Sequence, residues 1–73
     1  MLSFIIPAKD EEATLETLYS RVAKQVSTIG ISRFEVIFID DGSRDATWSV
    51  MHRLALAHPN HVRAFRLRRN FGK

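Results

Sequence analysis

The alternation of two short apolar runs with a helical stripe is the feature that most constrains how this chain can fold. Residues 2–6 and 34–39 are almost entirely apolar, which is typical of strands buried on both faces. Between them, apolar residues recur at the period of an amphipathic helix. This stripe consists of Leu15, Leu18, Tyr19, Val22, Ala23, Val26 and Ile29. The pattern predicts a strand that ends at Pro7, a helix that ends at Gly30 and a second strand, in that order.

The second half of the chain repeats this order. A shorter apolar stripe runs over residues 48–55, and a third strand-like run covers residues 62–67. Either Ser43 or Asp45 can cap the second helix. Strands that alternate with helices favour parallel pairing through right-handed crossovers. We therefore predict an α/β fold, a β-α-β-α-β parallel three-layer sandwich in which each helix covers one face of a three-stranded sheet.

Length and composition limit what such a fold can be. A chain of 73 residues has room for one small domain with a marginal core. The absence of cysteine excludes a disulfide framework and a thiolate metal site. No apolar run approaches the roughly 20 residues that span a bilayer, and the start lacks the basic region of a signal peptide. The expected compartment is cytoplasmic.

Charge is distributed unevenly along the chain. All eight acidic residues lie in residues 1–45, whereas residues 46–73 hold six Lys or Arg and no acid. The basic end indicates either an anionic partner or a solvated basic face. We expect Arg63 and Arg66 to solvate the exposed side of the third strand. The further basic residues Arg68, Arg69 and Lys73 either have that role or lie near a bound phosphate.

Two acidic loops follow the first two predicted strands, at the sheet edge where ligands bind in open α/β folds. They span residues 7–12 and 40–45 and carry six carboxylates together. The first loop lacks the glycines of a dinucleotide-binding fingerprint, and no Walker-type P-loop is present. A carboxylate here, Asp41 above all, can accept a hydrogen bond from a nucleobase or a ribose hydroxyl. We expect Ser43, Asp45 and Thr47 to serve as turn and helix-cap residues.

Three motifs in register resemble the start of a family 2 glycosyltransferase, of the dolichyl- or polyprenyl-phosphate mannosyl- or glucosyltransferase branch. They are SFIIPAKDEE at residues 3–12, VIFIDDGSRDAT at residues 36–47 and RLRRNFGK at residues 66–73. The resemblance implies the N-terminal, nucleotide-binding half of a GT-A (Rossmann-like) fold, truncated at the C-terminus, over residues 1–73. It also implies an intact enzyme that moves a hexose, with inversion, to a polyprenyl or dolichyl phosphate or another glycan acceptor.

The same resemblance assigns partners and site residues. The donor is a nucleotide-diphosphate sugar (a GDP- or UDP-hexose), and the lipid-phosphate acceptor lies at the cytoplasmic face of a membrane. The nucleotide-sugar-binding positions are Pro7, Lys9, Glu11, Ile39 and Asp41, with Asp40 as a supporting neighbour. Lys9 stands where relatives have an aromatic residue, and Asp10 where they have Asn.

The resemblance places the catalytic machinery outside this chain. An Asp-x-Asp motif that binds Mg or Mn is expected beyond Lys73 in the intact enzyme. Residues 1–73 are therefore expected to hold no catalytic residue and to bind no cofactor alone.

Two other hypotheses remain open. One is a non-catalytic module that binds anions or nucleic acid through residues 63–73. The acidic rim, which is the edge formed by the two acidic loops at residues 7–12 and 40–45, argues against a nucleic-acid partner. The other is an inactive remnant that self-associates to cover its sheet edges. In each case Tyr19 and Trp48 are expected in the core, and the three histidines on the surface or in caps. These are His52, His58 and His61.

Overall fold

Three strands and two helices alternate along the chain in a computed structural model that describes residues 2–67. The strands pair in parallel in the order β1-β2-β3. The α/β class, the element order and the parallel pairing are therefore confirmed. The elements are β1 (Leu2–Ala8), α1 (Leu15–Thr28), β2 (Phe34–Asp40), α2 (Thr47–Ala57) and β3 (Val62–Arg66).

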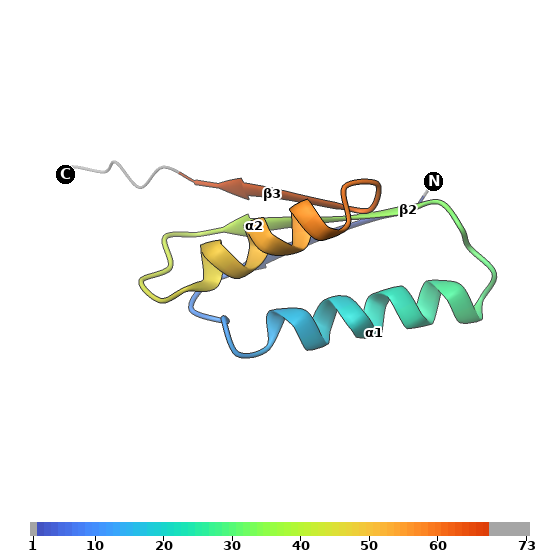
Figure 1. Ribbon diagram of the computed structural model, residues 1–73, viewed down its shortest axis with the longest axis horizontal. Helices are drawn as coiled ribbons and strands as arrows, with labels where there is room; N and C mark the ends of the chain where they lie inside the picture. The colour runs from blue at the N-terminus through green and yellow to red at the C-terminus, as the bar shows by residue number, and fades with distance from the viewer. Residues whose placement is uncertain (1, 68–73) are drawn as a thin grey trace.

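Both helices lie on the same face of the sheet (Figure 1), where α1 packs beside α2. This differs from the expected three-layer sandwich, because residues 2–67 form two layers. The reason is the strand order. Each crossover moves one strand further in the same direction, and two right-handed crossovers that move in the same direction place their helices on one side.

The core lies between the helices and one face of the sheet. Successive strand residues point to opposite faces, so Phe34, Val36 and Phe38 of β2 all face the helices and are buried. They pack against buried residues of both helices and of β3, which are Leu15, Tyr19, Val26, Val50, Met51, Leu54 and Val62. Tyr19 thus belongs to the core as expected, and the half-buried Trp48 packs against this core.

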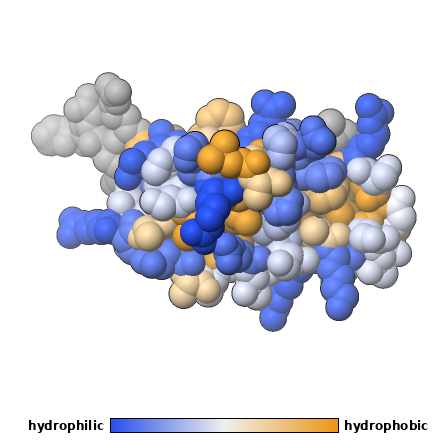
Figure 2. All heavy atoms as spheres, in the orientation of Figure 1, coloured by the Kyte–Doolittle hydropathy of each residue, from blue (hydrophilic) through white to orange (hydrophobic). Residues whose placement is uncertain are grey.

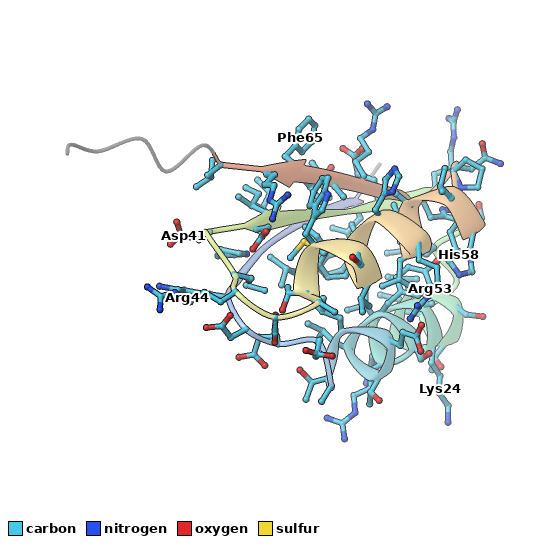
Figure 3. The ribbon with its side chains drawn as sticks, turned by 60° about the vertical axis from the view of Figure 1, so that its left-hand side comes forward. Lys24, Asp41, Arg44, Arg53, His58 and Phe65 are labelled. Carbon is cyan, nitrogen blue, oxygen red and sulfur yellow. The ribbon has the colours of Figure 1, made fainter. Side chains whose placement is uncertain are left out.

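The opposite face of the sheet is open in the part of the chain that the structure describes. Ile5 is 65% exposed and Phe65 is 52% exposed; the Phe65 side chain projects away from the helices (Figure 3). On the same face, Glu35 accepts a hydrogen bond from Ser3 Oγ at 2.9 Å and pairs with Arg63 at 3.4 Å. β1 and β3 are also the edge strands of this sheet. Self-association that covers these edges stays a prediction.

The sequence predicts that Gly30 ends α1 and that Pro7 ends β1. Gly30 has a φ of +81° and ends α1 as predicted. Its N–H donates to Ser27 O at 3.1 Å and that of Ile31 donates to Val26 O at 2.9 Å, which is the Schellman pattern. By contrast, Pro7 lies within β1 instead of ending it. A residue without an N–H is tolerated there because β1 is an edge strand of this sheet.

Hydrophilic side chains cover most of the surface on the side of α2, with scattered apolar groups between them (Figure 2). Neither helix among residues 2–67 is both long enough and apolar enough to cross a bilayer.

Candidate functional site

The carboxyl ends of β1 and β2 bring the two acidic loops together at one end of the sheet (Figure 1). Pro7 and Ile39 are register partners on adjacent strands, as are Ala8 and Asp40. The Asp41 N–H donates to Ala8 O at 3.1 Å, which continues the pairing past the strand ends. The structure therefore groups three of the predicted nucleotide-binding residues, namely Pro7, Ile39 and Asp41.

Lys9 and Glu11 lie further along the first loop, and both are exposed. The Glu11 carboxylate accepts a hydrogen bond from Thr14 Oγ1 at 2.9 Å, at the start of α1. The Glu11 N–H donates to Thr47 Oγ1 at 2.7 Å, so the backbone of this residue is held by the second loop. Lys9 and Glu11 thus border the group formed by Pro7, Ile39 and Asp41 without being part of its strand pairing.

A network of hydrogen bonds joins the two loops, and the sequence alone did not reveal it. The N–H of Asp10 donates to Ser43 Oγ at 2.8 Å, and its carboxylate accepts from the Arg44 N–H at 2.8 Å. In the same way, the Glu12 carboxylate accepts from the Ala46 N–H at 3.1 Å. These acids therefore have a structural role at the rim. The separations of 33 and 34 residues explain why no local pattern indicates them.

Two residues of these loops adopt left-handed backbone conformations. Gly42 has a φ of +79°, as a tight turn after the acidic pair requires. Asp10 has a φ of +55°, a conformation that Asp and Asn tolerate better than other residues with a Cβ. The replacement of the usual Asn by Asp10 is therefore compatible with the turn geometry.

Asp45 lies just before α2 but does not cap it in the expected way. Ala46 occupies the N-cap position of that helix, which has no side-chain cap hydrogen bond. Instead, the Asp45 carboxylate accepts bonds from both the hydroxyl and the N–H of Thr47, and one from the Glu12 N–H. The hydrogen bond from the Thr47 hydroxyl is the main cause of a lowered pKa of Asp45.

This lowered pKa gives a prediction for acid stability. Because the folded state binds the Asp45 proton less readily than the unfolded chain, the contribution is fully present above the ordinary pKa of 3.8 and declines below it. Asp45→Asn should therefore flatten the dependence of unfolding free energy on pH below about 4. Chemical denaturation at a series of pH values measures this. Glu16→Asn, on the exposed surface of α1, serves as the control, and an equal flattening in that variant would contradict the assignment.

Asp40 is fully buried at the end of β2, on the side of the helices. Its Oδ1 accepts a hydrogen bond from the Ser43 N–H at 3.0 Å, and its Oδ2 lies 3.4 Å from Arg66 Nε. This geometry suits the supporting role expected of Asp40, which stays a prediction.

The two arginines of β3 lie on opposite faces of the sheet, contrary to the expectation that both solvate its exposed side. Arg63 pairs with Glu35 on the open face, and Arg66 pairs with Asp40 on the helical face. The alternation of side chains along a strand is the reason, since Arg66 lies three positions after Arg63 and an odd step changes the face. Three other basic residues, Arg68, Arg69 and Lys73, lie outside the described residues.

The histidines lie away from the rim and in ring contacts. His58 is the C-cap of α2 and packs on Tyr19, while His61 stacks on Phe34 with ring centroids 4.3 Å apart. Residues 2–67 contain no group of three or more His, Cys, Asp or Glu side chains that could hold a metal ion. A groove of about 550 Å³ between α1 and α2 contains none of the predicted site residues.

Comparison with known proteins identifies the family of this chain. The model of the glycosyl transferase family 2 matches residues 3–73. An undecaprenyl-phosphate 4-deoxy-4-formamido-L-arabinose transferase of Shewanella sediminis is 36% identical over 72 residues, which cover 99% of this chain and 22% of the relative. A prophage bactoprenol glucosyl transferase homolog of Escherichia coli is 35% identical, over 99% of this chain and 23% of the relative.

The chain thus spans less than a quarter of the length of these relatives. Its match to the family model nevertheless extends over nearly all of its residues, including both rim loops. The chain belongs to glycosyl transferase family 2.

Proposed function

We propose that this chain is the nucleotide-diphosphate-sugar-binding portion of an inverting glycosyltransferase that transfers a hexose to polyprenyl phosphate. The observation that carries the proposal is the meeting of Pro7, Ile39 and Asp41 at the carboxyl ends of β1 and β2. That edge of a parallel sheet is where ligands bind in open α/β folds. The names of the relatives, which include bactoprenol and undecaprenyl phosphate, support the lipid acceptor.

The rim residues offer different kinds of contact to a nucleoside. Pro7 and Ile39 offer adjacent apolar contacts, and the half-buried Asp41 next to them offers a carboxylate for a base N–H or a ribose hydroxyl. The exposed Lys9 can pack its aliphatic stem on the nucleoside in place of an aromatic ring. Glu11 lies in the same loop as Lys9 and supplies a second acceptor. The donor is a GDP- or UDP-hexose.

The reaction proposed for the intact protein is a single displacement at the anomeric carbon. A phosphate oxygen of the lipid forms the new bond to that carbon as the bond to the nucleoside diphosphate breaks, and the bonding pair leaves with the diphosphate. The Mg or Mn implied by the resemblance does not fit residues 2–67, which gather no metal-ligand group. The acceptor places this reaction at the cytoplasmic face of a membrane.

Asp41→Asn tests the proposal in the full-length protein. Loss of a hydrogen bond to a charged group costs about 1.5–3 kcal/mol, so the dissociation constant for the preferred donor should rise about 10- to 150-fold. Titration calorimetry with UDP-glucose and GDP-mannose measures this.

The matched control is Glu35→Gln. It removes the same charge from near the opposite end of β2, where Glu35 pairs with Ser3 and Arg63 on the open face. We expect its donor affinity to equal that of the wild type. If both variants bind the donor as the wild type does, the role of Asp41 is wrong. If the wild type itself binds neither sugar nucleotide nor any other, the proposed function is wrong.

A further inference from the structure

Arg66 is the cationic side chain that pairs with the buried Asp40 in the part of the chain that the structure describes. Its Nε lies 3.4 Å from Asp40 Oδ2, an oxygen that is buried and makes no hydrogen bond among residues 2–67. A buried carboxylate oxygen without a partner is costly, because desolvation of the charge is not compensated. Arg66 is therefore the group that offsets this cost.

Packing and backbone contacts hold Arg66 in this place. Its guanidinium carbon lies 5.5 Å from the centroid of the Trp48 ring, a cation–π contact with the start of α2. The next residue, Leu67, donates its N–H to Asp40 O at 2.9 Å. Both the side chain and the neighbouring backbone of Arg66 thus connect the end of β3 to Asp40.

Asp40 in turn determines the path of the second loop. Its Oδ1 accepts the Ser43 N–H at 3.0 Å across the turn that contains Asp41 and Gly42. Two oxygens of one carboxylate move together, so an orientation that serves Ser43 through Oδ1 also requires a suitable partner at Oδ2. The contact with Arg66 supplies it.

We infer that Arg66 is a positioning residue of the nucleotide-sugar site. Braced on Trp48, it holds the Asp40 carboxylate in the orientation that binds Ser43, and this orientation fixes the backbone that presents Asp41. The inference rests on the proposed function for its ligand, but the coupling of Arg66 to the loop can be measured without one. The third family motif begins at Arg66, and the charge pattern predicted only an exposed arginine there; neither indicates its contact with Asp40.

The same strand provides a matched comparison. Arg63 also places its Nε 3.4 Å from a carboxylate oxygen, that of Glu35. The Glu35 side chain is 24% exposed, whereas that of Asp40 is fully buried. An exposed pair contributes little because water screens it, and loss of the partner of a buried charge costs far more. Arg63→Met and Arg66→Met therefore remove the same chemical group from two different environments.

The experiment measures amide hydrogen exchange over residues 41–46 of the full-length protein without ligand, then donor binding with UDP-glucose and GDP-mannose. In Arg66→Met, exchange in this loop should rise, and both the dissociation constant and the KM for the preferred donor should increase about tenfold with kcat unchanged. Arg63→Met should match the wild type in all of these quantities. Arg66→Lys should restore part of the loss, since it keeps the charge but not the planar stacking.

Each outcome decides the inference. Unchanged loop exchange in Arg66→Met overturns it, whether or not any nucleotide binds. Exchange that rises equally in β1 and α1 also overturns it, because that is general destabilisation, as does a lower kcat with an unchanged KM. If loop exchange rises while donor affinity is unchanged, the role in the site is wrong. If the wild type binds no sugar nucleotide, the proposed function fails, and loop exchange still tests the coupling between Arg66 and the loop.

Discussion

Replacement of Phe38 with Ala is expected to lower the free energy of unfolding by about 3–5 kcal/mol. Phe38 is fully buried at the centre of β2, between the sheet and both helices. The change removes apolar contacts and leaves a cavity that the surrounding strands cannot fill. A loss of this size is comparable with the whole stability of a domain of about this length, so most molecules should unfold. Denaturant titration followed by circular dichroism measures it.

Phe65→Ala is the matched control, since it makes the same chemical change on the open face of β3. Because Phe65 is 52% exposed, we expect a loss of less than about 1 kcal/mol. Equal losses in the two variants would contradict the two-layer arrangement. They would show instead that the face carrying Phe65 is covered in solution.

Thr47→Val is the second substitution with a large expected effect, about 1–3 kcal/mol. Thr47 is fully buried at the start of α2, and its hydroxyl lies at the junction of the two loops. The oxygen accepts the Glu11 N–H at 2.7 Å, and the hydroxyl donates to the Asp45 carboxylate. Valine keeps the shape but leaves both partners without this hydroxyl, so the cost is that of unpaired polar groups.

Two measurements separate this effect from a general one. Denaturant titration gives the loss of stability, and hydrogen exchange of the Glu11 amide should increase more than that of core amides. Thr28→Val is the control, because the exposed Thr28 hydroxyl only donates to Lys24 O near the end of α1. A Thr47→Val variant as stable as Thr28→Val would show that the hydroxyl does not hold the loops together.

Much of the fold could be predicted because it follows from local periodicity. The apolar stripe and Gly30 predicted α1 and its end, and the two apolar runs predicted β1 and β2. The structure differs from the prediction where the position of a residue at a sheet edge or on one face of the sheet determines its role. Pro7 lies inside β1 because it is at a sheet edge, and Arg63 and Arg66 separate because side chains alternate along β3. A composition or charge count does not contain that information.

The candidate site was predictable in its location and less so in its construction. Motif positions placed Pro7, Ile39 and Asp41 at strand ends, and the structure brings them together through parallel register. In the sequence, the acids near them form one cluster. Asp10 and Glu12, however, bind the backbone of the opposite loop, which only a three-dimensional arrangement shows.

By itself, the sequence determined the helices, the strands, their parallel order and the family, because these depend on periodicity and on motifs close together along the chain. The tertiary structure alone decided that both helices share one face and that the rim loops bind each other. It also decided that Arg66 meets Asp40 beside Trp48. The physical reason is distance along the chain: these contacts join residues 18 or more positions apart, and the direction of the crossovers and the register of the strands set which of them meet.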